Sequence, residues 1–200
     1  MNELHLVMHG LAIKKHATLE EVAGILGLDT NAVRATLDKL VKTNRAVEAK
    51  GRYLLTPAAR MVLDSDYSFM YEGLRADPAF QAGYAGFERL NVVLKQLITE
   101  WQTISVNGER VPNSHDDKEY DARMLDRLGD LHERAEVVLD QLASALARIR
   151  IYREKLSLAL TRAEDGEIAW VSDAKTESYH TLWFELHEDL LRLMRRERDE

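Results

Sequence analysis

The sequence contains no cysteine, and only three prolines and ten glycines among 200 residues. The absence of cysteine excludes disulfides, thiolate metal sites, iron–sulfur clusters and cysteine nucleophiles. Few prolines and glycines mean few chain breaks, which favours long helices over many short strands. No apolar run approaches the ~20 residues that a membrane-spanning helix needs, and the opening residues lack the basic and apolar stretches of a signal peptide. We therefore expect a cytoplasmic protein without membrane association.

Charge divides the chain into two unlike parts. The whole chain has 27 basic and 34 acidic side chains and a net charge of −7. Residues 1–60 hold nine basic and six acidic groups, a balance of +3, whereas residues 61–200 have a balance of −10. A basic part joined to an acidic part suggests that only the first meets a polyanion, although ordinary scatter also produces a difference of this size.

Three helices are predicted within the first forty-odd residues. Apolar side chains favour a first helix over residues 4–13. Thr18 followed by Glu21 forms a capping box, in which the two side chains satisfy backbone donors reciprocally at the start of a second helix. Asp29 or Thr30 can cap a third helix, whose apolar residues recur at three- and four-residue spacing.

A β-hairpin is predicted next, around Lys50 and Gly51, because glycine accepts the positive φ of a tight turn. Thr56 and Pro57 then begin a fourth helix, since proline suits the first helical position. Three helices followed by a hairpin are the order of a winged helix-turn-helix. We assign residues 1–75 to this module and its linker helix.

The same stretch resembles the MarR-like winged-helix superfamily. The resemblance covers under a third of the chain and lies in Thr18–Ala23, Leu26–Val33, Leu37–Leu40 and Leu54–Arg60. It implies a winged-helix fold and leads us to expect binding to double-stranded DNA. Winged helices also serve as protein-docking modules, so the fold predicts function less strongly than structure.

If the module binds DNA, its third helix enters the major groove with the N-terminal end first. Arginine there recognises guanine and asparagine recognises adenine, whereas lysines on phosphates position the protein without specifying sequence. The predicted DNA contacts are Thr30, Asn31, Arg34 and Ala35 on this helix, Lys50 and Arg52 at the hairpin tip, and Lys14, Lys15 and Lys42 as phosphate contacts. The alternative is that these side chains are solvated surface charges, and the nearby acidic groups Asp38 and Glu48 count mildly against strong binding.

A second resemblance begins at Leu4–Lys15. This segment looks like the helical opening of winged-helix segments found with actinobacterial pyruvate phosphate dikinase and related phosphoenolpyruvate-utilising enzymes. Later segments look like partners of such modules: Trp101-Gln102, Asn113–Asp116, Tyr120-Asp121 and Ser178–Leu190. The resemblance covers nearly the whole chain and implies association with a phosphotransfer enzyme rather than catalysis, because no phosphohistidine or nucleotide-binding motif is present.

Residues 76–200 are predicted to form an antiparallel helical bundle of four helices. The boundary falls at Ala76–Pro78, because the residue before proline disfavours helix. Apolar residues from Met124 to Ile149 alternate in steps of four and three, which is typical of a bundle seam. The sequence leaves open whether residues 117–164 form one helix or two, with a weak break near Arg150–Arg153.

Two further features of this acidic part are the loop around residues 107–113, indicated by Asn-Gly, and a last helix over about 174–198, capped by Asp173. This part also carries the candidate ligand or metal residues His115, Asp116, Asp121, His180, Trp183 and His187. Imidazole and carboxylate groups together bind divalent metals. His180 and His187 lie two helical turns apart, which is too far for one ion without further ligands. Packing of both histidines in or beside the core is the favoured interpretation, and metal binding stays open.

Enzyme motifs are absent: there is no G-x-S-x-G, Walker A loop, dinucleotide glycine pattern or H-E-x-x-H. We therefore predict neither an enzyme nor a cofactor. The favoured hypothesis is a homodimeric DNA-binding transcriptional regulator, since reading two half-sites requires a twofold partner, with a bundle that dimerises and responds to a small-molecule effector. The alternative is an accessory or docking protein for a phosphoenolpyruvate-utilising enzyme.

Overall fold

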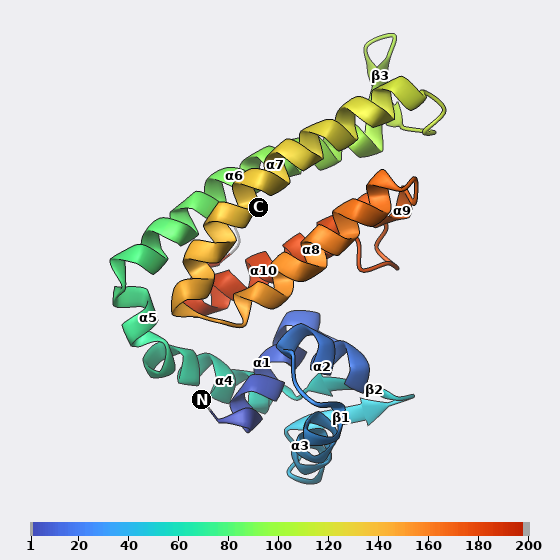
Figure 1. The fold of residues 1–200 in the computed structure, drawn as a ribbon. Helices are drawn as coiled ribbons and strands as arrows, with labels where there is room; N and C mark the ends of the chain where they lie inside the picture. The colour runs from blue at the N-terminus through green and yellow to red at the C-terminus, as the bar shows by residue number, and fades with distance from the viewer. Residues whose placement is uncertain (1, 198–200) are drawn as a thin grey trace. The chain divides into compact units, whose positions relative to one another are not determined.

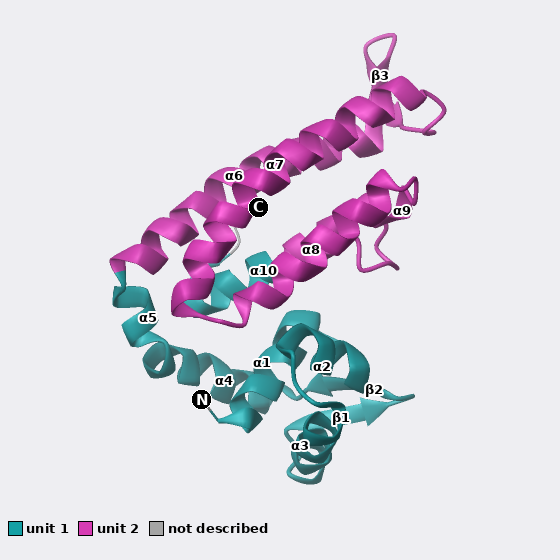
Figure 2. Ribbon diagram, in the orientation of Figure 1, with its two compact units in different colours: residues 1–77, 185–200 teal, residues 78–184 magenta. Residues whose placement is uncertain are grey.

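The computed structural model describes residues 2–197 and confirms a mostly helical fold with short antiparallel β-hairpins (Figure 1). The chain forms two compact units (Figure 2). Unit 1 comprises residues 1–77 together with the segment from Glu185 onward, and unit 2 comprises Pro78–Phe184. The sequence-based division assigned the segment from Glu185 onward to the bundle. Within residues 2–197, no helix combines the length and apolar character that crossing a lipid bilayer requires.

Unit 1 opens with three helices, a hairpin and two further helices. In chain order they are α1 (Glu3–Lys14), α2 (Leu19–Leu26), α3 (Thr30–Lys42), β1 (Ala46–Ala49), β2 (Arg52–Leu55), α4 (Pro57–Met70) and α5 (Glu72–Ala76). The second part of α10 (Tyr179–Met194) completes this unit.

Helix boundaries in unit 1 follow their capping residues. Thr18 Oγ1 accepts from the amide of Glu21 at 3.2 Å, and Glu21 Oε2 accepts from the amide of Thr18 at 2.7 Å, so the predicted capping box is confirmed. Gly27 ends α2 with a φ of 64°, a left-handed conformation that glycine adopts without steric cost. Asp29 caps α3 and Thr56 caps α4.

The predicted hairpin is also present. β1 and β2 pair antiparallel with Ala46 opposite Leu55, and Lys50 and Gly51 in the turn both have positive φ. Positive φ at both central residues is the turn geometry that matches the twist of two paired strands. A bridge between Ala17 and Tyr53 joins the segment before α2 to this hairpin through two backbone hydrogen bonds, of 2.7 and 3.1 Å.

A buried polar network ties α1, α4 and α10 together in unit 1. His9 and Asp189 are both fully buried, and His9 Nε2 lies 3.0 Å from Asp189 Oδ1. The other ring nitrogen of His9 is hydrogen-bonded to the hydroxyl of Tyr67 at 2.5 Å. One helical turn earlier, His5 Nε2 is hydrogen-bonded to the hydroxyl of Tyr71 at 3.1 Å. Because buried polar groups are costly unless they are paired, this network selects one arrangement of the three helices.

Two more contacts attach α10 to unit 1. Lys14 Nζ lies 2.7 Å from Glu185 Oε1, and each side chain is only about 10% exposed. Arg75 donates to the carbonyl oxygen of Leu193 at 2.9 Å. These bonds explain why the chain from Glu185 onward belongs to unit 1.

Unit 2 is built on long helices with one hairpin. In chain order its elements are α6 (Pro78–Gln102), β3 (Thr103–Val106), β4 (Glu109–Pro112), α7 (Lys118–Ala145), α8 (Ile149–Glu164), α9 (Ala169–Ser172) and the first turns of α10. The long predicted segment is thus two helices, which separate at residues 146–148 rather than near 150–153. The β3–β4 hairpin replaces the predicted loop, with Asn107 and Gly108 both at positive φ in its turn.

Close packing of α6 against α7 depends on two glycines. A Cβ atom at Gly83 would lie 2.9 Å from Leu142 Cδ2, and one at Gly86 would lie 3.1 Å from Val138 Cγ2. Both distances are shorter than ordinary van der Waals contact, and Leu142 is fully buried. The two helices therefore approach as closely as they do because these positions lack side chains.

The first turns of α10 complete the core of unit 2. The Trp183 ring stacks on Phe87 of α6 with centroids 4.7 Å apart, and its Nε1 donates to Asn91 Oδ1 at 3.1 Å. Tyr179 is hydrogen-bonded through its hydroxyl to His132 of α7 at 3.2 Å. Residues from α6, α7 and α10 thus share one core with mixed apolar and polar contacts.

The last helix begins later than the sequence predicts. Asp173 accepts from the amide of Lys175 and forms a turn rather than a helix cap. Ser178 takes that role, since its Oγ accepts from the amide of Thr181 at 3.3 Å. The helix ends at Met194, and the predicted end at residue 198 lies outside the described residues.

Substitution of His9 tests the buried network of unit 1. We expect His9→Leu to lower the free energy of unfolding by about 3–5 kcal/mol, because the fully buried Asp189 carboxylate loses the ring nitrogen that lies 3.0 Å from it. The double variant His9→Leu/Asp189→Leu should recover much of this loss, since two apolar side chains replace the pair. Urea unfolding followed by far-UV circular dichroism measures both effects. The control is Lys39→Leu at an exposed position of α3, and equal stability of all three variants would contradict the role of the pair.

Substitution of Gly83 tests the approach of α6 and α7. We expect Gly83→Val to lower the stability of unit 2 by about 1–3 kcal/mol through overpacking against Leu142. Gly129→Val in α7 is a matched control within unit 2, because a Cβ there meets only Glu164 Oε1, at 3.9 Å. Tryptophan fluorescence during urea unfolding reports on unit 2, which contains Trp101, Trp170 and Trp183. Equal losses in the two variants would show that close approach is not the cause.

Candidate functional site

Helix α3 exposes the face that the sequence predicts for DNA contacts. Its buried face consists of Val33, Leu37 and Leu40, each with no exposed surface. On the other side the exposed residues are Thr30, Asn31, Arg34, Ala35, Asp38, Lys39 and Lys42. The buried leucines and valine fix the rotation of the helix about its axis, so the outward direction of the polar face follows from the apolar spacing.

Four exposed basic side chains of α3 and the hairpin turn are unengaged. Arg34, Lys39, Lys42 and Lys50 make no side-chain hydrogen bond or ion pair with any residue in the described range 2–197. Acidic groups are also near: Asp29 Oδ1 accepts from the first amides of α3, and Asp38 is exposed on the same helix. The face therefore offers both hydrogen-bonding and charged groups to a ligand, with mixed sign.

Lys14 and Arg52 are placed differently from the sequence-based expectation. Lys14 is nearly buried in its ion pair with Glu185, so it does not present its charge as a phosphate contact requires. Arg52 donates at 2.8 Å to both the carbonyl oxygen of His16 and Glu21 Oε2, which ties the hairpin to the segment before α2. Lys15 is exposed at the end of α1. We therefore remove Lys14 and Arg52 from the expected DNA contacts and keep Lys15.

A second cluster forms where the β3–β4 hairpin leads into α7. His115 Nδ1 lies 3.0 Å from Asp121 Oδ1, and the His115 ring packs on Trp101 with centroids 4.5 Å apart. Asn113 donates to the carbonyl oxygen of Trp101 at 3.0 Å and accepts from the amide of His115 at 3.0 Å. Asp121 is buried, and its Oδ2 atom has no hydrogen-bond partner within residues 2–197. Two of the candidate ligand residues, His115 and Asp121, are thus brought together by a loop that is itself held to α6.

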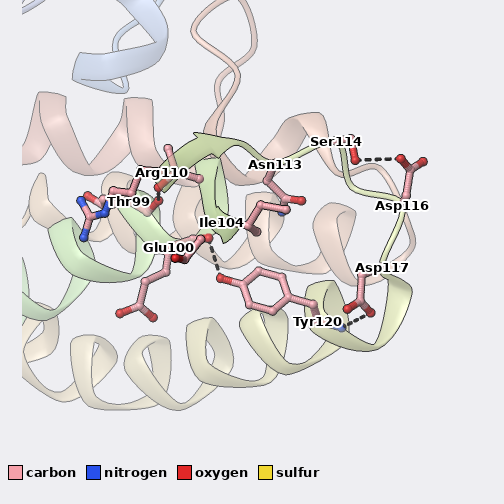
Figure 3. A pocket seen from close by; sticks show the side chains of 11 residues that line it. Thr99, Glu100, Ile104, Arg110, Asn113, Ser114, Asp116, Asp117 and Tyr120 are labelled. Atoms are coloured by element: carbon pink, nitrogen blue, oxygen red, sulfur yellow. Dashed lines mark hydrogen bonds between the residues drawn. The ribbon is translucent and has the colours of Figure 1, made fainter. Parts of the chain in front are cut away.

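Beside this cluster lies a cavity of about 620 Å³ that we call the hairpin pocket (Figure 3). Its lining residues come from α6, the β3–β4 hairpin, the following loop and the start of α7: Thr99, Glu100, Thr103, Ile104, Ser105, Arg110, Asn113, Ser114, Asp116, Asp117 and Tyr120. Asp116, a predicted ligand residue, lines the pocket and accepts from Ser114 Oγ at 2.7 Å. The hydroxyl of Tyr120 donates to the carbonyl oxygen of Glu100 at 2.7 Å and joins α7 to α6.

Glu100 keeps its negative charge at neutral pH. Hydrogen bonds from Gln96 and Arg127 hold the pKa of this carboxyl below its usual range, against a smaller opposing effect of burial. The Arg127 guanidinium also compensates the Glu100 charge directly. Glu100 therefore lines the hairpin pocket as a carboxylate whose charge is partly compensated by Arg127, with a further attraction to Arg110.

The remaining candidate ligand residues do not form a metal site. Trp183 is buried in the core of unit 2, His180 is half-buried on the same helix, and His187 is buried in unit 1. Burial lowers the pKa of His180, which favours its neutral form. In the described range 2–197, no group of three or more His, Cys, Asp or Glu side chains is arranged to hold a metal ion.

Most lining residues of the hairpin pocket are absent from the sequence-based candidates. Thr103, Ser105 and Arg110 are missed because the segment around Asn107-Gly108 is read as a loop. The sequence does contain a signal for a strand there: the β-branched residues Thr103 and Ile104 come shortly before the Asn107-Gly108 turn. A hairpin reading places Arg110 opposite Ser105, as the structure does.

The chain matches no protein-family model, and no curated protein or solved structure is significantly similar to it.

The pH dependence of stability tests the buried histidine of unit 2. His132 is hydrogen-bonded to Tyr179 and to Ser157, and burial lowers its pKa in spite of the opposing charge of Glu136. The unfolded chain therefore binds more protons than the native one between the lowered pKa and the ordinary value of about 6.5. Stability rises with pH through this window, with a slope of at most about 1.4 kcal/mol per pH unit for one histidine.

We expect His132→Gln to flatten this slope. The measurement is the free energy of unfolding by urea at pH 5.5 and 7.5, read by tryptophan fluorescence. Lys95→Gln, at an exposed position of α6, should keep the wild-type difference, because a lysine stays protonated at both pH values. A His132→Gln variant with an unchanged pH difference would show that His132 does not resist protonation in the native state.

Proposed function

We propose that this chain binds double-stranded DNA through unit 1, acting as a winged helix-turn-helix protein. The order of α1, α2, α3 and the β1–β2 hairpin supports this proposal. The bridge between Ala17 and Tyr53 also joins the segment between α1 and α2 to the hairpin, so the helices and the hairpin form one module. Within this arrangement α3 is the recognition helix and the Lys50-Gly51 turn is the tip of the wing.

The outer face of α3 is the observation that carries the proposal. Asn31 and Arg34 lie one turn apart near its N-terminal end, exposed, and Arg34 has no partner within residues 2–197. An α-helix fits the major groove, where arginine hydrogen-bonds guanine and asparagine hydrogen-bonds adenine. An exposed arginine without an intramolecular partner contributes little to stability, which leaves its donors for a base edge.

The phosphate contacts follow from the other exposed cations. Lys15 follows the end of α1, Lys42 is the last residue of α3 and Lys50 lies in the hairpin turn, and each is exposed. Such contacts position a protein without reading sequence. We further propose that the protein is a homodimeric transcriptional regulator, because two recognition helices related by a twofold axis read two half-sites.

DNA binding is tested with the full chain in three steps. Selection from a random 20-bp duplex pool gives the preferred sequence, and fluorescence anisotropy at about 50 and 200 mM salt then gives its affinity and salt slope, expected near 0.9 per phosphate contact. We expect Arg34→Ala to weaken binding to the selected sequence by about 1–3 kcal/mol and to reduce its preference over a scrambled duplex. Lys50→Ala should weaken both duplexes alike and lower the salt slope by about one.

The control variant is Lys95→Ala, which removes one exposed positive charge from α6 in unit 2. It should leave affinity, sequence preference and salt slope unchanged. The proposal is wrong if no sequence is enriched, or if Arg34→Ala and Lys95→Ala behave alike. Either outcome would favour a protein-docking role for the same module.

A further inference from the structure

We propose that the hairpin pocket is a binding site for a small zwitterionic molecule that carries a carboxylate and an ammonium group on an apolar body. This inference concerns unit 2 and does not rest on DNA binding by unit 1. A volume of about 620 Å³ lies within the range of about 300–1,000 Å³ that is typical of small-molecule sites.

Arg110 supplies the positive end of the pocket. Its side chain projects from β4 beside Thr99 and Glu100, at the end of the pocket away from Asp116 (Figure 3). Arg110 makes no side-chain hydrogen bond or ion pair with any residue that the structure describes. Glu100 attracts Arg110 electrostatically, but the Glu100 oxygens are hydrogen-bonded to Gln96 and Arg127 rather than to Arg110, so the Arg110 donors stay available. The planar guanidinium donates two parallel hydrogen bonds to a carboxylate, so a carboxylate is the group that this end fits.

Asp116 and Asp117 supply the negative end. One oxygen of Asp116 accepts from Ser114, and one oxygen of Asp117 accepts from the amide of Tyr120. The second oxygen of each carboxylate has no hydrogen bond within residues 2–197. Two carboxylates with unused acceptor sites suit an ammonium group, which carries three donors.

The middle of the pocket suits an apolar body. Ile104 and the ring of Tyr120 lie between the two charged ends in Figure 3, and Tyr120 is fixed by its bond to α6. A simple anion would bind Arg110 but meet the repulsion of two aspartates, and a simple cation would meet the reverse. Only a ligand with both charges matches both ends, since complementary charge decides which partner is accepted.

Three related probes separate these contributions. The first is the dipeptide alanyl-phenylalanine, a zwitterion with an apolar side chain. The second is its N-acetyl derivative, which lacks the ammonium group, and the third is its C-terminal amide, which lacks the carboxylate. Isothermal titration calorimetry on the full chain measures each affinity. We expect the dipeptide to bind with a Kd below about 1 mM and each derivative to bind at least about tenfold more weakly.

Variants assign each charge to its residue. In Arg110→Gln, the dipeptide and its amide should bind equally, because the partner of the carboxylate is gone. In Asp116→Asn, the dipeptide should lose most of its advantage over the N-acetyl derivative. The matched controls are Arg134→Gln and Asp126→Asn on exposed positions of α7, which should bind all three probes as the wild type does. Circular dichroism verifies that every variant is folded.

Three results would overturn the proposal. One is equal binding of the dipeptide and both derivatives to the wild type. Another is unchanged selectivity in Arg110→Gln and Asp116→Asn. The third is no binding at about 10 mM by free phenylalanine, the dipeptide and the tripeptide alanyl-alanyl-phenylalanine, since these span the lengths of zwitterion that the pocket admits.

Discussion

The contact between His9 and Asp189 is the constraint on which unit 1 depends. Two side chains 180 positions apart in the chain meet with no exposed surface, 3.0 Å apart. Burying a carboxylate is expensive, and the cost is offset only if its partner sits at hydrogen-bonding distance. The first helix therefore accepts the last one in a single register, in which Tyr67 of α4 completes the bonding of His9. Apolar packing alone tolerates several registers of α10 against α1 with similar energy. The polar network selects one of these registers.

Helix α10 repeats this principle in unit 2 with different chemistry. Trp183 donates to Asn91, and Tyr179 is hydrogen-bonded to His132, each within a mostly apolar core. Burial raises the pKa of Tyr179 far above its ordinary value, so the phenol stays neutral and keeps its hydroxyl proton for the bond. A single helix thus contributes polar anchors to both cores. Neither core is complete without the segment that comes last in the chain, although the sequence pattern assigns all of that segment to the bundle.

The sequence predicts those features whose causes are local. The Thr18 and Glu21 capping box, the Asp29 cap and the Lys50-Gly51 turn each depend on residues within three positions of one another, and the structure contains all of them. Residues 146–148, where α7 and α8 separate, contain no glycine or proline, so the break follows from packing that the sequence does not reveal. The sequence does not predict the contact between His9 and Asp189 for the same reason, because no residue near either position indicates its partner. His115 and Asp121 are an intermediate case: the sequence names both among the candidate ligand residues, but neither their contact nor the pocket beside them.

Counting charged residues in the sequence does not distinguish basic side chains that stabilise the fold from basic side chains that bind a ligand. Lys14 and Arg52 count toward the positive balance of residues 1–60, yet the first is nearly buried against Glu185 and the second joins the hairpin to Glu21. Arg34 and Arg110 contribute the same unit charge, but each is exposed without an ion pair among the described residues. An unpaired arginine adds little to stability, since even well-formed surface ion pairs contribute only about 0–1 kcal/mol. Folding therefore does not require an arginine at either position. Substitution of Arg34 or Arg110 should change binding while leaving the free energy of unfolding nearly unchanged.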